Sequence, residues 1–319
     1  EALQGGANDP SSVPERQLLL SQSESLVSRF NQIYSRLSLQ SQAIDQQLSA
    51  SVAEVNSLST GIAKLNEAIT IAIGAGQGNE PNELMDERDE LLRQLSEKVN
   101  VSVIPQGDNQ LNVFIGKGQP LVINNTFNQL GVVESSTNPT ESDIAYIGQT
   151  GTQVITNDIT GGTIGGSLEF RGTILKESIS SMGLIATVLA DTVNQQHKLG
   201  MDLENNLGGS FFTDINDPSL MSSRVIGNQN NLPPMDKVVG VEIVDSSKLT
   251  TTNYQLQFGG PSALDYRVIN DNSGEVVRQG VLPGFLPASI EIEGFAINLE
   301  AGTFQVGDKF SIQPTRYGA

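Results

Sequence analysis

The 319-residue chain has no cysteine and no tryptophan, and it contains a single histidine, His197. Without cysteine there are no disulfides, no thiolate nucleophile and no thiolate zinc site. One imidazole is too few for most catalytic metal sites, and the sequence offers His197 no convincing acid or nucleophile partner. These absences argue against most enzyme classes, so we expect a protein that is not an enzyme and needs no cofactor.

Basic residues are scarce. Lys and Arg together number 18 against 36 Asp and Glu, which gives a formal net charge of -18. A chain this acidic repels nucleic acid and anionic membrane surfaces. The longest strongly apolar stretch, residues 182–190, is far shorter than the ~20 residues of a membrane helix. We therefore expect a soluble protein that binds neither nucleic acid nor a membrane, and the N-terminus shows no signal peptide.

What the sequence does contain is a long helical pattern near its start. Ser12 and Glu15 have the spacing of a capping box, which marks a helix N-terminus. Apolar residues then recur every three or four positions across residues 30–69, interrupted only by Gly61. The pattern predicts one helix over residues 14–71, about 58 residues and roughly 87 Å long. Few charged residues flank the apolar seam, so other elements should cover it.

A second helix is expected to pack back along the first. The glycines and proline of residues 74–81 predict a turn, and residues 82–99 (NELMDERDELLRQLSEKV) begin at an Asn cap and place leucines on one face. Glu87, Arg88 and Asp89 occupy consecutive positions of this helix, so they cannot face each other across a cleft as paired catalytic carboxylates do. We interpret Arg88 as a local ion-pair partner, and the charged run as a solvated or ion-paired face of the helix.

From residue 99 the pattern changes to short alternating runs rich in β-branched residues, separated by Gly, Asn and Pro turns. A helical period returns between about residues 162 and 198, and alternating runs resume after Gly200. The predicted fold is a multidomain α+β protein, a long-helix rod or bundle with two inserted, mainly antiparallel β modules. The expected domains are residues 1–98 (first helical part), 99–165 (β module), 166–200 (returning helix) and 201–319 (second β module).

The segment VNQQHKLGMDLENNLGGSFF, residues 193–212, contains the candidate chemistry. His197 falls at a predicted helix end, where an imidazole complements the helix dipole. Asp202, Glu204 and the following Asn and Gly residues loosely resemble a calcium loop, but their spacing is irregular and no bidentate Glu follows, so a turn is favoured. A hydrolase that pairs Asp202 and Glu204 with a carboxylate from another module stays open as an alternative.

Three blocks resemble the hook-associated protein 1 family, the hook–filament junction proteins of the bacterial flagellum: PNELMDERDELLRQLSEKVNVSV (81–103), GGSLEFRGTIL (165–175) and residues 193–212. The third is the most specific, because its family pattern is a helix that ends in Asn-x-Gln-His, followed by glycines, an Asp-containing turn and paired Phe. The residues of this chain that match the pattern are Asn194, Gln196, His197, Gly200, Asp202, Gly208, Phe211 and Phe212.

The resemblance implies a structural adaptor between hook and filament that packs side by side with copies of itself in a tubular lattice. In that lattice Glu87, Arg88 and Asp89 are candidate lateral contacts. It implies further partners, namely the hook protein, hook-associated protein 3 and an export chaperone. It also implies a location outside the cell, on the flagellum, after type III export without a cleaved signal. The chain lacks the heptad-rich terminal segments of the family, so we expect a core fragment that is monomeric in solution.

The same resemblance makes residues 193–212 the exit from a helix into the second β module. His197 then ends the helix, Asp202 lies in a turn, and Phe211 and Phe212 are apolar anchors. A surface adhesin or carbohydrate-binding protein that uses the second β module is the alternative from another class. Such a module would show a shallow aromatic or calcium-bearing groove, although the strands carry few aromatic residues.

Overall fold

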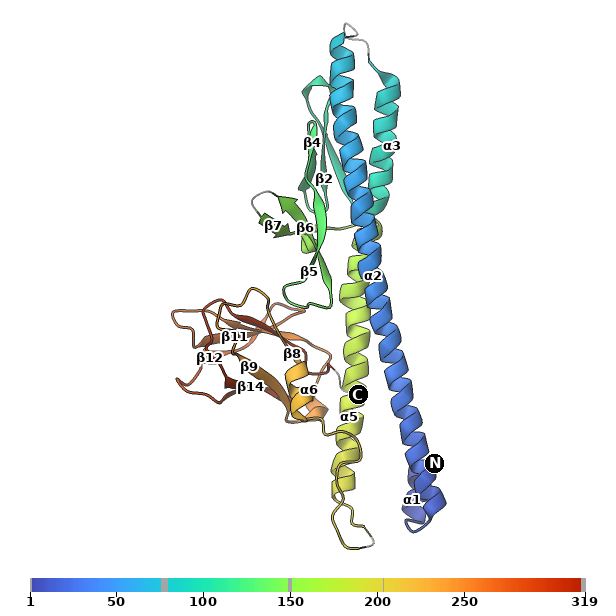
Figure 1. Ribbon diagram of the computed structural model, residues 1–319, viewed down its shortest axis with the longest axis vertical. Helices are drawn as coiled ribbons and strands as arrows, with labels where there is room; N and C mark the ends of the chain where they lie inside the picture. The colour runs from blue at the N-terminus through green and yellow to red at the C-terminus, as the bar shows by residue number, and fades with distance from the viewer. Residues whose placement is uncertain (1, 76–79, 149–150, 203, 317–319) are drawn as a thin grey trace. The chain divides into compact units, whose positions relative to one another are not determined.

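The computed structural model describes residues 2–75, 80–148, 151–202 and 204–316 (Figure 1). Its contacts divide the chain into two compact units. Unit 1 comprises residues 1–38, 136–138 and 176–319, and unit 2 comprises residues 39–135 and 139–175. The first long helix contributes to both units, as does the helical run that follows the first β module.

Helix α2 (Val13–Ala75) is the predicted long helix and spans 63 residues. It begins where the capping box predicts, and the Ser12 hydroxyl accepts a hydrogen bond from the Glu15 amide at 3.4 Å. A short helix that we did not predict, α1 (Ala2–Asn8), precedes it. The buried residues of α2 begin only at Ile44, so the apolar seam is covered in unit 2 and largely uncovered before it.

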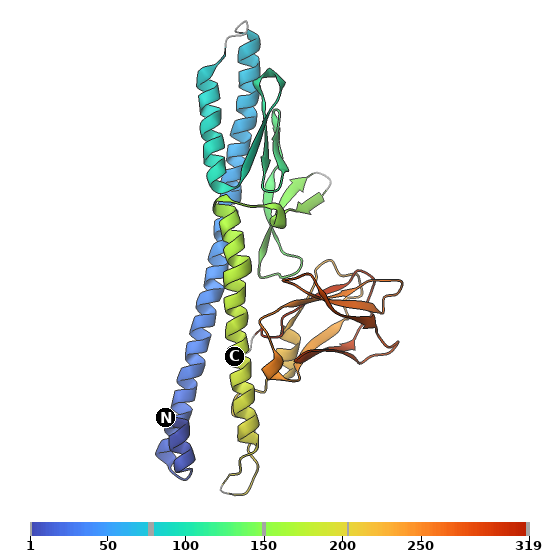
Figure 2. The ribbon, with the colours of Figure 1, turned by 180° about the vertical axis from the view of Figure 1, so that it is seen from behind.

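In unit 2, α3 (Asn82–Lys98) lies beside α2 in both views (Figures 1 and 2). Leu95 and Val99 are buried, and Lys98 forms an ion pair with Glu54 of α2. The expected cap at Asn82 is wrong: Pro81 occupies the N-cap position, and no side chain caps the helix. Half of the predicted turn over residues 74–81, namely residues 76–79, lies outside the described residues.

The first β module forms two antiparallel sheets in unit 2. The four-stranded sheet runs in sequence order through β1 (Val101–Pro105), β2 (Leu111–Ile115), β3 (Gln119–Ile123) and β4 (Thr126–Phe127). The three-stranded sheet contains β5 (Leu130–Glu134), β6 (Ser142–Gly148) and β7 (Gly151–Val154). The strands match the predicted runs except β4, which is too short to show an alternating pattern.

The returning helix is not one regular α-helix. It consists of α4 (Gly162–Phe170), a π-helical turn (Arg171–Leu175) and α5 (Lys176–Lys198). At the π turn, Arg171 donates to Asp45 and to the Ser142 carbonyl oxygen, both at 2.7 Å. This ion pair is largely buried and ties the turn to α2 and β6 within unit 2. π-helical segments in proteins occur mostly as single turns inside an α-helix, as this one does between α4 and α5.

The run Gly162–Lys198 is also apolar enough by length and composition to cross a membrane, with a hydropathy of 1.3 over its best window. This differs from our expectation, which considered only uninterrupted apolar stretches. In unit 1, however, Leu184 and Ala190 of this run pack against the core of the second β module. A helix that forms part of a core meets the same hydropathy criterion, so the run is weak support for a membrane span.

The second β module, in unit 1, contains a five-stranded and a three-stranded antiparallel sheet with orders β12-β11-β10-β15-β8 and β13-β14-β9. Its elements are α6 (Pro218–Ser223), β8 (Val225–Gly227), β9 (Val238–Ile243), β10 (Tyr254–Phe258), β11 (Asp265–Asn270), β12 (Val276–Val281), β13 (Ala288–Ile292), β14 (Phe295–Ala301) and β15 (Lys309–Ile312). The single predicted run SIEIEGFAINL is a hairpin, β13 and β14, which turns at Gly294 with φ of 89°.

One continuous core joins these two sheets to α5. Side chains such as Val241, Leu256 and Ile297 are fully buried in it, and Leu184 and Ala190 of α5 pack against it. The chain also returns to α5 near its described end: a Cβ added at Gly183 would lie 1.8 Å from the Thr315 carbonyl oxygen. A glycine at this position is what allows the C-terminal segment to pack directly on the helix.

Candidate interface at the end of α5

The best-defined polar cluster of the predicted site is centred on Asn194, near the end of α5. This side chain is 3% exposed, and its Oδ1 accepts hydrogen bonds from the amides of Phe211 and Phe212, both at 2.8 Å. Its Nδ2 donates to the carbonyl oxygens of Phe212 at 3.1 Å and Thr213 at 3.5 Å. One buried amide therefore satisfies four backbone groups where the chain returns to the helix.

His197 is exposed and lies in the last turn of α5, as predicted. Its Nδ1 lies 2.8 Å from the Gly209 carbonyl oxygen, and because a carbonyl only accepts, this nitrogen carries the proton. Gly208 packs so closely over the helix end that an added Cβ would lie 2.0 Å from the His197 carbonyl oxygen. His197 thus holds the segment that follows α5 against the end of the helix. The contacts of the described residues include no catalytic partner for it.

Asp202 organises the turn that follows. Its carboxylate accepts hydrogen bonds from the Asn206 amide at 2.8 Å, the Glu204 amide at 2.9 Å and the Asn206 side chain at 3.0 Å. These bonds, chiefly those from Asn206, lower the pKa of Asp202. The carboxylate is therefore used within the turn, and among the described residues no group of three His, Asp or Glu side chains could hold a metal ion. Leu203, which follows Asp202 in the sequence, lies outside the described residues.

Phe211 and Phe212 are half-buried rather than core residues. Their rings make an edge-to-face pair with centroids 5.0 Å apart, and Phe211 also contacts the His197 ring at 5.7 Å. The apolar residue of this segment that enters the β core is Ile215, which is 7% exposed. The anchor is thus shared: hydrogen bonds of Asn194 hold the Phe backbone, and Ile215 supplies the buried side chain.

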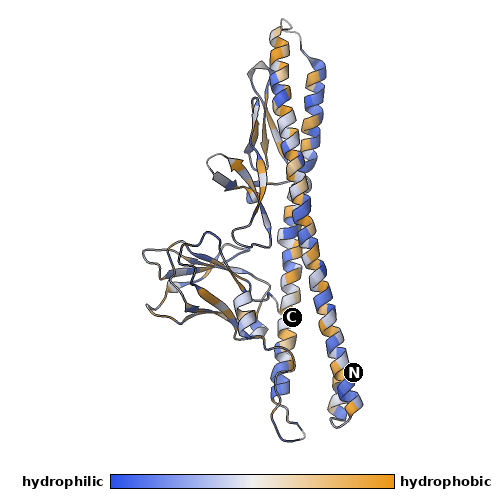
Figure 3. Ribbon diagram, viewed as in Figure 1, coloured by the Kyte–Doolittle hydropathy of each residue, from blue (hydrophilic) through white to orange (hydrophobic). Residues whose placement is uncertain are grey.

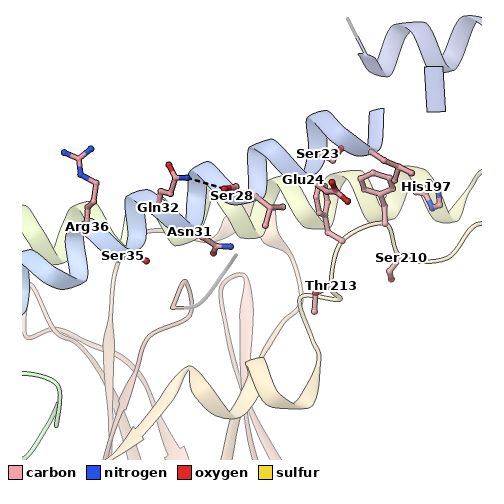
Figure 4. A pocket seen from close by; sticks show the side chains of 14 residues that line it. Ser23, Glu24, Ser28, Asn31, Gln32, Ser35, Arg36, His197, Ser210 and Thr213 are labelled. Carbon is pink, nitrogen blue, oxygen red and sulfur yellow. Dashed lines mark hydrogen bonds between the residues drawn. The ribbon is translucent and has the colours of Figure 1, made fainter. Parts of the chain in front are cut away.

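The same segment lines a groove of about 1010 Å³ against the first third of α2, within unit 1 (Figure 4). From α2 come Ser23, Glu24, Ser28, Asn31, Gln32, Ser35 and Arg36, and opposite them lie His197, Ser210 and Thr213 (Figure 4). Leu20, Val27 and the two Phe rings give the groove an apolar floor. Its lining extends over residues 20–36 of α2 and mixes polar with apolar side chains, which suits contact with a protein surface better than capture of a small polar substrate.

Exposed apolar side chains continue along this part of α2. The hydropathy colouring shows apolar residues recurring along the helix (Figure 3). Those that are at least one-third exposed before the buried seam begins are Val13, Leu18, Leu20, Leu26, Val27, Ile33 and Leu39. At about 3.6 residues per turn these positions are spread around the helix, but Leu20 and Val27, which line the groove, fall on the same side of it.

The three candidates on α3 separate in the structure. Glu87 and Asp89 are exposed, whereas Arg88 is only 3% exposed. The expected local ion pair of Arg88 is wrong among the described residues: its Nη1 donates to Asn66 Oδ1 at 3.1 Å and to the Asn109 carbonyl oxygen at 2.7 Å. Arg88 therefore joins α2, α3 and the first β module inside unit 2. A lateral contact by this arginine would need its side chain to leave these partners.

Sequence reasoning had not given Asn194 a role, although it had matched the residue to a family pattern. A usable signal was present, because Asn194 follows the buried Thr187 by seven residues and so falls on the same face of α5. A polar residue on a buried helix face must find hydrogen-bond partners there. Arg171 was missed in the same way, because a π turn has no clear signature in one sequence.

Comparison with known proteins finds relatives that match nearly the whole chain. A family model described as the flagellar hook-associated protein FlgK helical domain matches residues 1–212. Flagellar hook-associated protein 1 of Salmonella typhimurium (strain LT2) is 30% identical over 318 residues, which are 98% of this chain and 54% of that protein. The protein of the same name from Escherichia coli (strain K12) is 29% identical over 324 residues, with the same coverage of 98% and 54%.

A solved structure agrees. The flagellar hook junction protein FlgK from Burkholderia pseudomallei superposes with a TM-score of 0.85 at 32% identity, covering 99% of this chain and 55% of that one. The chain thus spans about half the length of the relatives that it matches. Because the family model covers well over half of the sequence and the solved relative shares its fold, the chain belongs to the flagellar hook-associated protein FlgK family.

Proposed function

We propose that this chain is part of a structural adaptor that joins the hook of a bacterial flagellum to its filament. The observation that carries the proposal is the match to FlgK over residues 1–212, together with the fold shared with a flagellar hook junction protein at a TM-score of 0.85. The side chains after the middle of α5 are consistent with a structural role, because Asn194, His197 and Asp202 form hydrogen bonds within the fold.

The partners that we propose are further copies of this protein packed side by side, the hook protein and hook-associated protein 3, with an export chaperone before assembly. The location is the flagellum outside the cell, reached by type III export without a cleaved signal. Support comes from the groove beside the first part of α2, whose lining includes the exposed Leu20 and Val27 and which offers a protein-sized contact surface. Exposed Glu87 and Asp89 supply charges at the flank of α3.

We also propose that residues 99–165 and 201–319 are β modules inserted into a helical framework formed by residues 1–98 and 166–200. The strand positions support this division, since β1 to β7 lie between Val101 and Val154 and β8 to β15 lie between Val225 and Ile312. In such an arrangement helix flanks carry the contacts between copies, and the β modules can vary without altering those contacts.

The test is a chimera in Salmonella typhimurium in which these 319 residues replace the matching segment of flagellar hook-associated protein 1. Filaments attached to hooks, seen by electron microscopy, and spreading in soft agar are the expected results. A chimera with Asn194→Ala should lose them if the helix exit is needed. Bare hooks would contradict the proposal, provided that the chimera is found intact in the culture medium and so has been exported and is stable.

The adhesin and hydrolase alternatives make different predictions. A glycan-binding module or a glycosidase binds a sugar in the folded state, and such a ligand raises the melting temperature. A glycan array and a calcium titration, followed by melting of the chain, test both. We expect no shift, and a reproducible shift with one sugar class would favour the adhesin.

A further inference from the structure

The second β module has an edge strand that is uncovered on both faces. β12 is the terminal strand of the five-stranded sheet, so among the described strands only β11 pairs with it. Every residue of β12 except Gly280 is exposed. The exposed fractions of Val276, Val277 and Val281 are 42%, 41% and 66%. Because the outer backbone groups of an edge strand are free to pair, this edge offers a partner both apolar side chains and hydrogen-bonding groups.

Arg278 gives this edge a positive charge. It is exposed, it is the one charged residue within β12, and it forms no ion pair with the residues that the structure describes. Of the features that normally protect such edges, β12 has a β-bulge beside Val268 of β11 but no lysine or proline. The strand that complements this edge is therefore one that carries carboxylates.

The same module has a second free edge, and its charge is negative. β13 is the terminal strand of the three-stranded sheet, with β14 as its partner among the described strands. Ile290 is buried in the core, whereas Ser289 and Glu291 on either side of it are exposed. Glu293 follows the strand and is also exposed, and neither carboxylate forms an ion pair within the described part of the chain. The two free edges of one module thus carry opposite charges.

We propose that β12 of one copy of this chain pairs in antiparallel fashion with β13 of a neighbouring copy, with Arg278 opposite Glu291. The proposal rests on the proposed function in that copies pack side by side. Opposite charges directly across two strands stabilise their pairing, and like charges weaken it. The charges therefore favour β12 with β13 over β12 with a second β12, which would bring two Arg278 side chains close together.

The register also brings apolar residues together. With Arg278 opposite Glu291, Val281 lies opposite Ala288 at the rim of the neighbour's core. Because one copy carries both edges, the contact is head-to-tail and repeats from copy to copy instead of closing a dimer. An edge of six residues is small beside the about 1,200–2,000 Å² that stable interfaces bury, so each contact alone is weak. Repetition around a tube makes such a contact effective.

The test is sedimentation velocity at about 0.15 M salt on two charge-reversed chains, measured separately and mixed in equal amounts. All chains also carry Leu20→Ser and Val27→Ser, which remove the apolar contribution of the groove beside α2. In Arg278→Glu, β12 repels the β13 of its own kind, and in Glu291→Arg, β13 repels the β12 of its own kind. In the mixture each β12 meets a β13 of opposite charge. We expect the mixture to associate like the unreversed chain, and each variant alone at least about threefold more weakly.

Two variants control for the change in net charge. Arg16→Glu on α2 and Glu83→Arg on α3 alter the net charge by the same amounts at exposed positions outside the β module, and should associate like the unreversed chain. The proposal is overturned if these controls weaken association as much as the reversed variants do, or if the mixture is as weak as the separate variants. Absence of association of the unreversed chain at high protein concentration also overturns it.

A carbodiimide cross-link locates the contact. Arg278→Lys keeps the charge and supplies an amine, which forms an amide with the activated Glu291 carboxylate of a touching copy. Mixing ¹⁵N-labelled with unlabelled chains separates links between copies from links within one chain. We expect mass spectrometry to find position 278 joined to Glu291 in peptide pairs with one labelled and one unlabelled half, and to lose this link in Glu291→Gln. Links from position 278 to other carboxylates only overturn the proposal.

Both measurements are made in solution and report on this one contact. They can therefore fail while the chimera still forms filaments, and they can succeed while the chimera leaves hooks bare. The first result overturns the pairing of β12 with β13 alone, and the second overturns the proposed adaptor function alone.

Discussion

Three asparagines in the helices fasten non-helical segments to them by the same device. Asn56 of α2 exchanges two hydrogen bonds with the backbone of Leu130, and Asn66 bonds the backbone of Leu111 through both its oxygen and its nitrogen. Asn194 of α5 does the same with Phe211 to Thr213. In each case a side-chain amide replaces the strand partner that the backbone would otherwise need.

Replacement of Asn194 by Ala should therefore be costly. Two backbone amides and two carbonyl oxygens lose their partner, and unsatisfied buried groups cost about 1–3 kcal/mol each. Allowing for water at the half-buried groups, we expect the free energy of unfolding to fall by about 2–4 kcal/mol, measured by urea denaturation followed by circular dichroism. Gln195→Ala, which removes an exposed bond to Asp191, is the control and should change little. Equal stability of the two variants would contradict the role of Asn194.

The half-burial of Phe211 and Phe212 changes the expected cost of removing them. A fully buried Phe→Ala substitution costs about 3–5 kcal/mol. Because both rings are partly exposed, we expect Phe211→Ala and Phe212→Ala together to lower the free energy of unfolding by about 3–5 kcal/mol, the cost of one fully buried Phe. Differential scanning calorimetry of the double variant checks this, with Ile215→Ala as the comparison for a core residue. An unchanged melting curve would show that the pair anchors nothing.

Asp202 should show a depressed pKa in solution because Asn206 donates to it from both side chain and backbone. A carboxyl whose folded pKa is lowered adds stability above its unfolded pKa of about 3.9. That stability is lost as the pH falls through the lower folded pKa. A carboxyl ¹³C NMR titration should place the midpoint of Asp202 below its ordinary value, and Asn206→Ala should move it back upward. A midpoint that Asn206→Ala leaves unchanged would argue against this origin.

At the scale of elements, patterns that repeat along the chain correctly predicted the long helix and most of the strands. The capping box at Ser12 and the apolar period of α2 gave that helix to within a few residues at both ends. Strand runs bounded by turn residues corresponded to most strands of both β modules. Short or irregular elements were missed, namely α1, β4, α6, β8 and the π turn. These depend on a few tertiary contacts, such as the pairing of β8 with β15, which leave no periodic signal.

The contact between α5 and the C-terminal segment gives a prediction at this scale. Gly183→Ala would place a methyl group 1.8 Å from the Thr315 carbonyl oxygen, so the two segments must separate. We expect a loss of about 1–3 kcal/mol in unfolding free energy, the usual range for overpacking. Gly166→Ala in α4 is the matched control, because nothing lies within 4 Å of its added Cβ. That variant should be neutral or gain up to about 1 kcal/mol from helix propensity, and a loss at Gly166 as large as at Gly183 would point to a general helix effect.

At the scale of the whole molecule, charge and exposed apolar surface act in opposite directions. A net charge of -18 repels other copies, whereas the exposed Leu20 and Val27 in the groove beside α2 favour contact with them. Salt reduces the repulsion, since the Debye length falls from about 10 Å at 0.1 M to about 3 Å at 1 M. Association of copies should therefore be weakest at low ionic strength.

Sedimentation velocity at a fixed protein concentration measures this balance. We expect a monomer at about 20 mM salt and a rising share of larger species toward 1 M salt. Leu20→Ser with Val27→Ser should suppress that rise if the groove beside α2 carries the contact. Arg93→Gln, on the exposed face of α3, serves as the control. Stronger association at low salt would mean that opposite charges drive the contact.

The sequence alone determined what depends on local periodicity and composition. These include the long α2 helix, the alternation of helical and β segments, the acidic surface, the scarcity of catalytic groups and the turn at Asp202. Residue motifs in order along the chain also indicated the family. Only the tertiary structure decided that Arg88 is buried against Asn66, that Asn194 holds the Phe backbone, and that Arg224 is fully buried. Each of these depends on which distant segments meet, and no local pattern encodes that.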